Sequence, residues 1–360
     1  MSFKETIFMT GFPGFIAGRL VEQLSTPDTQ FFLLVQSAFV EKAMKDVQKI
    51  TESTQTPLKN FAIIEGDITL ENLGMSDADL EVVINETTDI YHLAAIYDLG
   101  VEKAIAYKVN VDGTKNVNEL VKKVKNLRRY NYVSTCYVAG KRDDVIYESE
   151  LVHDKGFRNY YEETKYFAEV EVEKLKATHP VTIFRPSVVC GDSKTGETAK
   201  YDGIYYVIKF LLKFPEVFRL VNVGNDDVRL NLVPVDFVID AMTKLATDEK
   251  AIGKTIAVAD PNPLTTKELC DSIAEAITDK KSVITPPAKV VESFLNSPLS
   301  PSLTGLPHSG VPYFFIPQTY DTQIADELLK EQGVACPSFT DYVGNLVRFV
   351  EEHPKLNEAK

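Results

Sequence analysis

Short apolar segments alternate with longer amphipathic segments through the first half of this 360-residue sequence. The apolar segments have strand length and are rich in β-branched and aromatic residues. They occupy residues 6–10, 31–35, 61–65, 89–95, 130–135 and 181–186. The segments between them have helical periodicity, as at 16–24, 41–50, 110–124 and 160–175. This alternation predicts βαβ units and therefore an α/β fold, a doubly wound parallel sheet with helices on both faces.

The pattern changes after about residue 195. A polar stretch, SKTGETAKYDG, precedes a helix-like segment, and Pro and Ser are frequent between residues 286 and 317, which indicates a long ordered loop or a flexible lid. The last segment is expected to form a helix that starts at Ser338 and ends before Pro354. We expect a nucleotide-binding domain over residues 1–195, with part of 227–260 returning to it. Residues 196–226 and 261–360 are expected to form a smaller, discontinuous substrate lobe.

Composition and charge disfavour several classes of function. The net charge of −13 argues against a nucleic-acid partner and against an anionic membrane surface. No apolar run is long enough for a membrane span, and the first residues, MSFKETIF, lack the apolar region of a signal peptide. Scattered His residues give no expectation of a metal site. The widely spaced cysteines predict free thiols and a cytoplasmic location; they are Cys136, Cys190, Cys270 and Cys336.

The segment MTGFPGFIAG, residues 9–18, joins the first predicted strand to the first predicted helix and contains three glycines. Glycine weakens helices and strands by roughly 0.5–1 kcal/mol relative to alanine, so we expect that a bulky anion approaches the backbone here. Gly11 would make the tight turn, and Gly14 would admit a pyrophosphate to the helix N-terminus. A turn that simply requires glycine is the alternative, which the βαβ context disfavours. The predicted loop contacts are Gly11, Phe12, Gly14, Phe15 and Ile16.

In this context TGFPGFIA resembles the TGxxGxxG fingerprint of the extended short-chain dehydrogenases/reductases, which bind NAD(P) on a Rossmann fold. Ala17 replaces the third glycine, where only close packing of helix on strand is required. Gln36 and Ser37 follow the second strand, and the acidic residue that would repel a 2′-phosphate is missing, which favours NADP(H) over NAD(H). The resemblance implies further cofactor contacts at Asp67, Ile68, Ala94 and Ala95.

The chemistry of this superfamily depends on a tyrosine and a lysine four residues apart, together with a hydroxyl. The spacing Y-x-x-x-K occurs at Tyr137/Lys141, Tyr161/Lys165 and Tyr205/Lys209. The resemblance favours Tyr161 and Lys165, which lie at the start of the predicted helix between the last two strands. A free tyrosine has a pKa of about 10, and Lys165, one helical turn away, is expected to favour the tyrosinate. Tyr161 then exchanges a proton with the substrate oxygen while hydride moves at the neighbouring carbon.

The hydroxyl of the site is expected at the end of the preceding strand. VSTCYVAG matches the superfamily segment S-[ST]-x-x-x-x-G. Counting back from Gly140 selects Thr135, with Ser134 as the alternative.

Three other matches carry weaker implications. FRPSVVCGD matches R-P-x-x-V-x-G and implies that Pro186 and Val189 lie near the nicotinamide, whereas Arg185 is expected to be structural. Asn110 matches an N-x-x-G-T helix, and both a structural anchor and a catalytic role remain open. Asp236 in LVPVDFV is expected to cap a helix rather than to take part in chemistry.

Several segments resemble the fatty acyl-CoA reductase, or male sterility, branch, which includes thioester reductases. They are VSTCYVAG, RPSVVCGDSKTG, NLVPVDFV and the tail YDTQIADELLKEQGVACPSFTDYVGNLVRFV. The resemblance implies an oxidoreductase that reduces an acyl thioester or an apolar carbonyl compound with NADPH, and superfamily members often form homodimers. The apolar segment YDGIYYVIKFLLKFPEVF suits a hydrophobic substrate groove or a buried helix.

Two other hypotheses remain. A sugar-nucleotide epimerase or dehydratase would need basic groups in the small lobe for a diphosphate, and Arg219 and Arg229 are the few candidates. A non-enzymatic dinucleotide-binding regulator is disfavoured because this chain retains Tyr161 and Lys165.

Overall fold

The computed structural model describes residues 3–218 and 221–356 and contains a parallel sheet of seven strands. These strands are β1 Glu5–Thr10, β2 Thr29–Val35, β3 Phe61–Glu65, β4 Asp89–His92, β5 Arg129–Val133, β7 Val181–Pro186 and β10 Thr255–Val258. Their spatial order is β10-β7-β5-β4-β1-β2-β3. The predicted doubly wound parallel sheet is confirmed. The chain reverses its winding direction between β1 and β4, and ligands bind outside the carboxyl ends of the strands at such a point.

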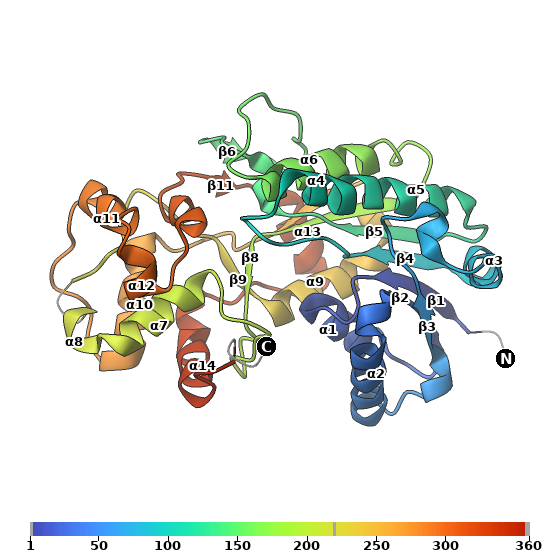
Figure 1. Cartoon of the computed structure of the whole chain (residues 1–360), viewed down its shortest axis with the longest axis horizontal. Coiled ribbons are helices and arrows are strands. Elements are labelled where there is room, and N and C mark those ends of the chain that lie inside the picture. Colours follow the sequence, from blue (N-terminus) through green and yellow to red (C-terminus); the bar gives the residue numbers. More distant parts are fainter. Residues whose placement is uncertain (1–2, 219–220, 357–360) are drawn as a thin grey trace.

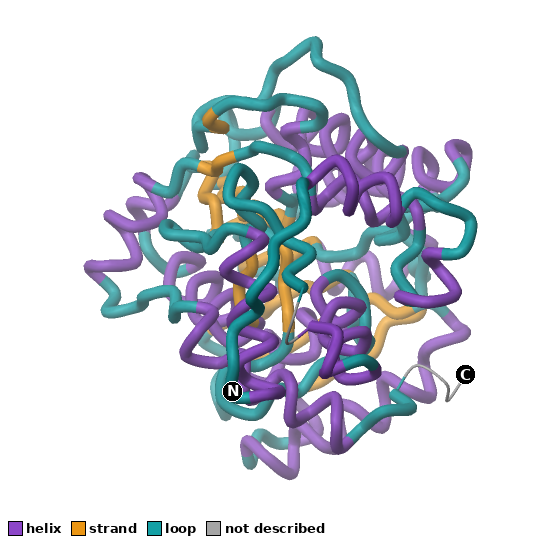
Figure 2. The backbone as a smooth tube through the Cα atoms, turned by 90° about the vertical axis from the view of Figure 1, so that its left-hand side faces the viewer, coloured by secondary structure: helices purple, strands orange, loops and turns teal. Residues whose placement is uncertain are grey.

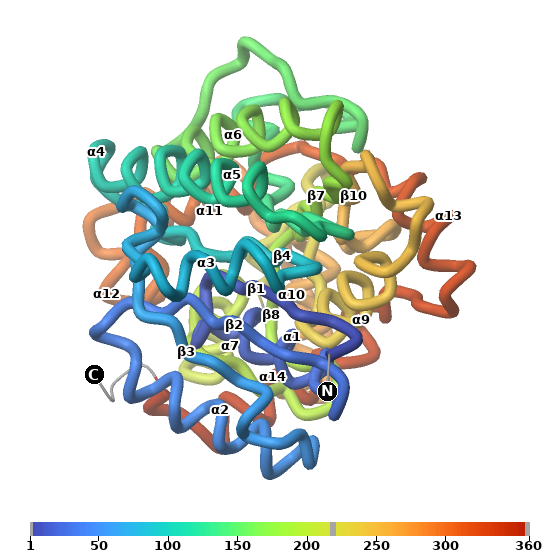
Figure 3. The backbone as a smooth tube through the Cα atoms, turned by 90° about the vertical axis from the view of Figure 1, so that its right-hand side faces the viewer, coloured from blue at the N-terminus to red at the C-terminus, as the bar shows by residue number. Residues whose placement is uncertain are grey.

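Helices cover both faces of the sheet (Figure 1, Figure 3). On one face lie α3 Asp77–Glu86, α5 Gly113–Lys123 and α6 Tyr160–Glu173. On the other lie α1 Phe15–Leu24, α2 Val40–Thr54, α9 Val235–Ala246 and α13 Gln323–Glu331. Each layer has an apolar core, because alternate residues of a strand point to opposite faces. In β1, for example, Phe8 belongs to the first core and Met9 to the second.

A smaller helical lobe lies beside the sheet, at the left of Figure 1. It contains α7 Ile204–Lys213, α8 Pro215–Phe218, α10 Thr266–Thr278, α11 Ala288–Leu295, α12 Ser300–Thr304 and α14 Phe339–Glu352. Seen from this side, helices and long loops lie in front of the strands (Figure 2). Buried residues of α7, α10 and α14 form a third core. The predicted last helix is confirmed as α14, with Ser338 at its N-cap.

The Pro- and Ser-rich stretch 286–317 differs from the expected loop or lid. It contains α11, α12 and a 3₁₀-helical segment, His308–Phe314. Pro287 precedes α11, and Pro301 lies in the first turn of α12. N–H groups in the first turn of a helix form no intrahelical hydrogen bond, so proline can occupy this position without breaking one. The prolines therefore start these short helices instead of preventing them.

Two short parallel ladders join distant parts of the chain. β8 Val188–Cys190 pairs with β9 Leu232–Pro234, and β6 Val145–Ile146 pairs with β11 Thr319–Tyr320. Helix α13 belongs to the segment 261–360 but packs with α9 in the core beneath the large sheet. The domain division at residue 195 stays a prediction.

Candidate active site

The turn between β1 and α1 lies at the carboxyl edge of the sheet. Its glycines leave backbone atoms there that no side chain covers. Gly11 has a φ of +94°, and a Cβ at this position would lie 2.9 Å from the backbone nitrogen of Ala94. Gly14 precedes α1, is exposed, and donates its N–H to the carbonyl oxygen of Gly11 at 2.8 Å. The first turn of α1 has no acidic residue. Its free N–H groups and helix dipole therefore fit the diphosphate of a dinucleotide.

The other predicted residues of this loop lie in different environments. The Phe12 side chain is buried in the core, so only its backbone is available to a cofactor. Phe15 and Ile16 begin α1 and are partly buried against the same core. Lys42 donates from Nζ to the carbonyl oxygen of Pro13 at 2.5 Å and to Asp46 Oδ2 at 3.0 Å, so its charge is paired beside the loop. Motif spacing does not identify Lys42, because it lies in a separate, largely exposed helix.

Gln36 and Ser37 follow β2 and are hydrogen-bonded to acidic residues at the end of β3. Gln36 Nε2 donates to Asp67 Oδ2 at 2.9 Å, and Ser37 Oγ donates to the Glu65 carboxylate. Burial would raise the pKa of the Asp67 carboxyl, but hydrogen bonds outweigh it and hold that pKa below its usual range. The Ile68 side chain is buried beneath α5, which leaves Asp67 as the accessible member of the predicted pair.

The loop after β4 is held against the glycine turn. Thr10 Oγ1 accepts the N–H of Ala94 at 3.1 Å and is 2.7 Å from Nδ1 of His92. Burial lowers the pKa of His92 to about 3, so this ring is neutral. Ala94 is partly exposed and Ala95 is exposed, so both lie at the surface beside the glycine turn.

Asn110 links this loop to the helix that carries Tyr161. It lies in the π-helical turn Tyr107–Asp112, which is continuous with α4 Lys103–Ala106. Asn110 Oδ1 accepts the N–H of Ile96 at 2.8 Å, and its Nδ2 donates to Thr164 Oγ1 at 2.9 Å. Both the oxygen and the nitrogen of the Asn110 amide are hydrogen-bonded, and the residue is 1% exposed. The geometry therefore favours a structural role for Asn110.

Tyr161, Lys165 and Thr135 converge between the end of β5 and the first turns of α6. Asn159 caps α6 by accepting the N–H of Glu162 at 3.0 Å, which fixes where the helix starts. The Tyr161 side chain is buried, and Thr135 is the neighbour that acts to lower the pKa of its phenol. The structure thus brings together the three residues that the sequence suggests for catalysis.

Ser134, the alternative hydroxyl, is hydrogen-bonded elsewhere. Its Oγ donates to the carboxylate of Glu169, which also accepts Nε and Nη2 of Arg185 at 2.9 and 2.5 Å. Glu169 and Arg185 are both buried, so Ser134 is part of an internal ion-pair network. The geometry selects Thr135 and gives Arg185 the structural role expected for it.

Burial controls the charges of Tyr161 and Lys165. It raises the pKa of Tyr161 well above its usual value even though Thr135 acts to lower it, and it lowers the pKa of Lys165 to about 8. Lys165 Nζ donates to the carbonyl oxygen of Val133 at 2.8 Å and to Tyr132 Oη at 3.1 Å. In the protein alone, burial favours the protonated phenol of Tyr161. The expectation that Lys165 favours the tyrosinate stays a prediction.

The other two tyrosine–lysine pairs have different surroundings. Tyr205 is 1% exposed, and its hydroxyl accepts the N–H of Gly191 at 2.8 Å. Tyr137 lies in the short 3₁₀ segment Cys136–Ala139, which ends at Gly140 with a φ of +57°. Tyr137 and Lys141 therefore do not lie on the same helix. Tyr205 is buried in the core of the helical lobe.

The predicted nicotinamide end contains an unpaired hydroxyl. Pro186 ends β7, and Val189 lies in β8, where it pairs with Val233. Between them, Ser187 Oγ is buried and has no hydrogen-bond partner among residues 3–218 and 221–356. A buried hydroxyl without a partner is costly, so this atom fits a ligand that offers it a polar group, such as a carboxamide. Ser187 is not identified by sequence spacing, because serine after a strand is common in loops.

Asp236 does not cap a helix, and that expectation is wrong. It lies inside the first turn of α9, after the N-cap residue Pro234. Its carboxylate accepts the N–H of Ser193 at 2.9 Å and the Ser193 hydroxyl at 2.6 Å, which fastens the loop after β8 to α9.

A polar cavity of about 290 Å³, part of it open to solvent, lies beside Tyr137, two residues after Thr135. It is lined by Tyr137, Val188, Arg229, Leu230, Asn231, Tyr313, Ile316, Gln318 and Tyr320. Arg229 donates from Nη1 to the carbonyl oxygen of Pro263 at 2.5 Å. The other basic candidate for a sugar nucleotide, Arg219, lies outside the described residues. The walls combine aromatic rings with a few amides and one guanidinium, which suits a small organic substrate.

Neither a metal centre nor a bilayer-spanning helix is found in the part of the chain that the structure describes. No three His, Cys, Asp or Glu residues there are grouped so that they would hold a metal ion. The helices in the same ranges are each too short or too polar to cross a bilayer.

The family model described as male sterility protein matches residues 9–242. The chain is 27% identical over 278 residues to fatty acyl-CoA reductase wat of Drosophila melanogaster, covering 67% of this chain and 54% of that protein. It is 27% identical over 276 residues to fatty acyl-CoA reductase 1 of Mus musculus, covering 66% and 53%. The chain thus spans about half the length of these curated relatives.

Solved structures share the fold at low sequence identity. The terminal R domain from the myxalamid PKS-NRPS biosynthetic pathway has a TM-score of 0.82 and 24% identity, covering 100% of this chain and 93% of that domain. UDP-glucuronic acid 4-epimerase from Bacillus cereus in complex with NAD has a TM-score of 0.65 and 20% identity, covering 98% and 99%. These likenesses confirm the predicted fold.

Proposed function

The chain belongs to the male sterility protein family, and from this premise we propose that it is an NAD(P)H-dependent oxidoreductase that reduces an acyl thioester or an apolar carbonyl compound. The observation that carries the proposal is that Thr135 and Tyr161 lie together, with Lys165 one turn along the same helix. The fatty acyl-CoA reductase names of the relatives support this substrate class.

The residues present fit the cofactor. Gly11, Gly14 and the start of α1 would hold the diphosphate, Asp67 would lie at the adenine end, and Pro186 to Val189 would lie at the nicotinamide end. When bound, the reduced nicotinamide supplies a hydride. The Lys165 ammonium would donate to a ribose hydroxyl from its position beside Val133 and Tyr132.

Tyr161 is the proton donor in this proposal. Its raised pKa keeps the phenol protonated near neutral pH, so it can donate its O–H to the substrate oxygen as negative charge develops there. Thr135 holds that oxygen with a second hydroxyl. The surrounding buried side chains exclude water and strengthen both hydrogen bonds.

Replacement of the acid tests the proposal directly. Tyr161→Phe is expected to lower NADPH oxidation with hexadecanal or palmitoyl-CoA by roughly 10²–10⁴-fold, because the proton donor is lost. Tyr160→Phe is the matched control, since this neighbour is 40% exposed and is not one of the three candidate catalytic residues. Undiminished turnover in Tyr161→Phe would contradict the mechanism.

We also propose that NADPH is preferred to NADH. Gln36 and Ser37 themselves carry no charge, in contrast to the acidic residue that would repel a 2′-phosphate at this position. Gln36→Asp is expected to lower kcat/KM for NADPH relative to NADH, because it places a carboxylate at that position. Gln36→Asn, which changes length without charge, is the control, and an unchanged NADPH/NADH ratio in Gln36→Asp would overturn this assignment.

A sugar-nucleotide epimerase is tested in the same preparations by thermal shift with UDP-sugars. A response to UDP-sugars together with no response to acyl or aldehyde substrates would favour it.

Residues 196–226 and 261–360, apart from α13, are proposed as the substrate lobe. The homodimer and the cytoplasmic location expected from the sequence stay predictions.

A further inference from the structure

A buried ion pair is hydrogen-bonded to the segment that carries Thr135. Glu169 and Arg185 are 0% and 3% exposed, and Glu169 Oε1 accepts Nε and Nη2 of Arg185 at 2.9 and 2.5 Å. The other carboxylate oxygen of Glu169 accepts the hydroxyl of Ser134. We call Ser134, Glu169 and Arg185 the Glu169 network. Desolvation of two buried charges offsets most of their attraction, so stability alone does not explain why the pair lies here.

Glu169 lies on the same face of α6 as Tyr161 and Lys165. The three residues follow one another at intervals of four, and side chains one turn apart on a helix are neighbours. All three are buried. A row of side chains therefore leads along the helix from the phenol to the ammonium and on to the carboxylate, which places a negative charge one turn beyond Lys165.

The members of this row contact three consecutive residues at the end of β5. The lysine donates to the carbonyl oxygen of Val133 at 2.8 Å, and the carboxylate accepts the hydroxyl of Ser134. The phenol lies next to Thr135. Because Ser134 is the middle residue of the three, the carboxylate of Glu169 fixes the backbone between the lysine contact and the candidate hydroxyl.

Arg185 attaches the same carboxylate to the neighbouring strand, β7. The N–H of Ser134 donates to the carbonyl oxygen of Phe184 at 2.7 Å, and Cys136 Sγ donates to the carbonyl oxygen of Arg185 at 3.1 Å. Glu169 thus joins α6 to the ends of β5 and β7. These three elements carry the candidate catalytic residues and lead to the predicted nicotinamide contacts.

We propose that Glu169 is a positioning residue, whose carboxylate holds the Ser134–Thr135 segment against α6 and whose negative charge stabilises the ammonium of Lys165. The inference rests on the proposed function and goes beyond it, because Glu169 touches neither substrate nor cofactor in that proposal. Burial lowers the pKa of Lys165, and the charge of Glu169 opposes this effect. Without the carboxylate, Lys165 would therefore lose its proton at a lower pH.

The other titratable groups around this row differ from Lys165 in their titration. Burial moves the pKa of four of them so that they are neutral near pH 8; they are His92, Tyr132, Cys136 and Tyr161. Glu169 raises the pKa of Arg185 against its burial, so the guanidinium stays cationic. Burial raises the pKa of Glu148 to about 7, and the Glu148 carbonyl oxygen accepts Nη1 of Arg185 at 3.4 Å. Glu148 and Glu162, which follows Tyr161, are the same in every variant below, so ratios of variant to wild type isolate the effect on Lys165.

The charge of Glu169 is tested through the pH dependence of kcat/KM for NADPH oxidation with hexadecanal. Glu169→Gln keeps the size of the side chain and removes its charge. Its kcat/KM relative to wild type should fall roughly threefold or more between pH about 6.5 and pH about 8.5, because less Lys165 is then cationic. Glu173→Gln is the matched control, since this carboxylate lies one turn further along α6 and pairs with Lys176 at 2.6 Å. A constant ratio in Glu169→Gln, or an equal fall in Glu173→Gln, would overturn the inference.

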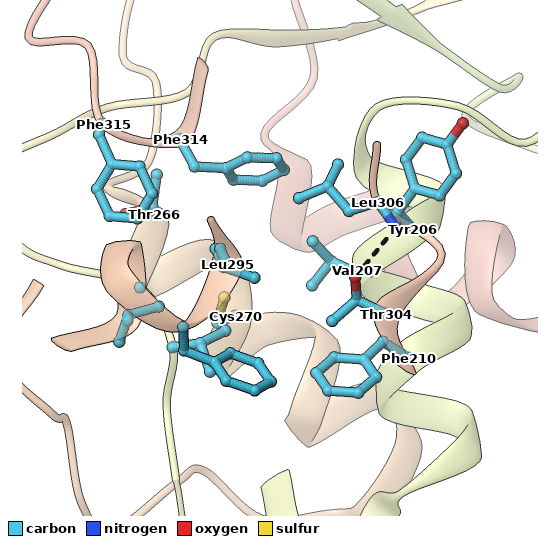
Figure 4. A pocket seen from close by; sticks show the side chains of 14 residues that line it. Tyr206, Val207, Phe210, Thr266, Cys270, Leu295, Thr304, Leu306, Phe314 and Phe315 are labelled. Carbon is cyan, nitrogen blue, oxygen red and sulfur yellow. Dashed lines mark hydrogen bonds between the residues drawn. The ribbon is translucent and has the colours of Figure 1, made fainter. Parts of the chain in front are cut away.

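A general loss of stability is distinguished from the loss of charge by a variant in the helical lobe. This lobe contains an apolar cavity of about 590 Å³, part of it open to solvent, and no residue of the Glu169 network lines it. In Figure 4, Val207, Phe210 and Leu306 face the open centre of the cavity from one side and Leu295 from the other. Leu306→Ala enlarges this cavity and should lower the temperature of unfolding. Its kcat/KM relative to wild type should not change with pH, and a fall like that of Glu169→Gln would overturn the inference.

Ser134→Ala tests the positioning role, because it keeps both charges of the ion pair. It should lower kcat about threefold or more with no change in the pH dependence, since the segment with Thr135 is no longer held in place. Glu169→Asp, which keeps the charge on a shorter side chain, should behave in the same way. If Glu169→Gln does not fold, these two variants decide the question, and wild-type kcat in both would overturn the inference.

If no aldehyde or thioester is reduced, the proposed function fails on its own, and NADPH binding then tests the inference separately. Lys165 is proposed to donate to a ribose hydroxyl, so the Kd of NADPH depends on its charge. Between pH about 6.5 and pH about 8.5, the Kd measured from NADPH fluorescence should rise more steeply for Glu169→Gln than for wild type or Glu173→Gln. The same pH dependence in all three proteins, or no binding by any of them, would reject the inference.

Discussion

At the scale of single residues, the charge of Lys165 is the most sensitive feature of the site. The side chain is 4% exposed, and burial lowers the pKa of its ammonium to about 8 although Glu169 opposes this. Tyr132 and Val133 accept its N–H groups, and the Tyr132 ring centre lies 4.6 Å from Nζ. Lys165 is therefore cationic below about pH 8 and neutral above it, whereas Tyr161 remains protonated throughout.

This environment predicts the pH dependence of the reduction. kcat/KM reports ionisations of the free enzyme, so it should be constant below pH about 8 and fall above it as Lys165 loses its charge. Tyr132→Phe removes one acceptor from the ammonium and should move the decline to lower pH. Full pH profiles of kcat/KM for both proteins check this expectation, and a profile that stays flat to pH about 10 would contradict it.

At the scale of secondary-structure elements, the start of α13 depends on one buried carboxylate. Glu148, 2% exposed and next to β6, accepts the N–H of Ala257 in β10 at 2.7 Å. It also accepts the N–H groups of Ile324 and Ala325 in the first turn of α13, at 2.5 and 3.2 Å. A single side chain thus satisfies donors from a strand and a helix that are far apart in the sequence, and it attaches both to the loop before α6.

Removal of this carboxylate should destabilise the fold. Glu148→Ala leaves three buried N–H donors without an acceptor and should lower the free energy of unfolding by roughly 3 kcal/mol. Glu150→Ala is the control in the same loop. Its carboxylate pairs with Arg142 at 2.9 Å, but its side chain is 44% exposed, so a change of about 0.5 kcal/mol or less is expected. Urea denaturation of both variants measures the difference, and similar stabilities would show that the α13 contacts are not important.

At the scale of the whole molecule, the site lies where the two parts of the chain are joined. The β8–β9 ladder, the β6–β11 ladder and the Tyr313–Glu162 hydrogen bond all lie near the carboxyl edge of the large sheet. The polar cavity takes walls from both parts of the chain, with Tyr137 from one and Tyr313 from the other. Substrate specificity is therefore expected to depend on the helical lobe, whereas Tyr161, the proposed proton donor, is held by the sheet and α6.

Much of this architecture could be predicted from the sequence because it depends on local rules. The strands and the glycine turn follow from hydrophobic periodicity and from the small size of glycine. Spacing alone gave three tyrosine–lysine pairs, and the resemblance to the superfamily favoured Tyr161/Lys165 among them. The short helices within 286–317 were harder to predict, since proline at the start of a helix and proline in a loop have the same local signature.

The amino-acid sequence by itself determined the order of the strands along the chain, the turn that fits a diphosphate and the set of residues able to do the chemistry. Only the tertiary structure decided between the adjacent hydroxyls of Ser134 and Thr135, because Glu169 approaches one and Tyr161 the other across the fold. It also decided that burial favours the protonated form of Tyr161. Desolvation and enclosure arise from side chains that are distant in sequence, so no local pattern contains them.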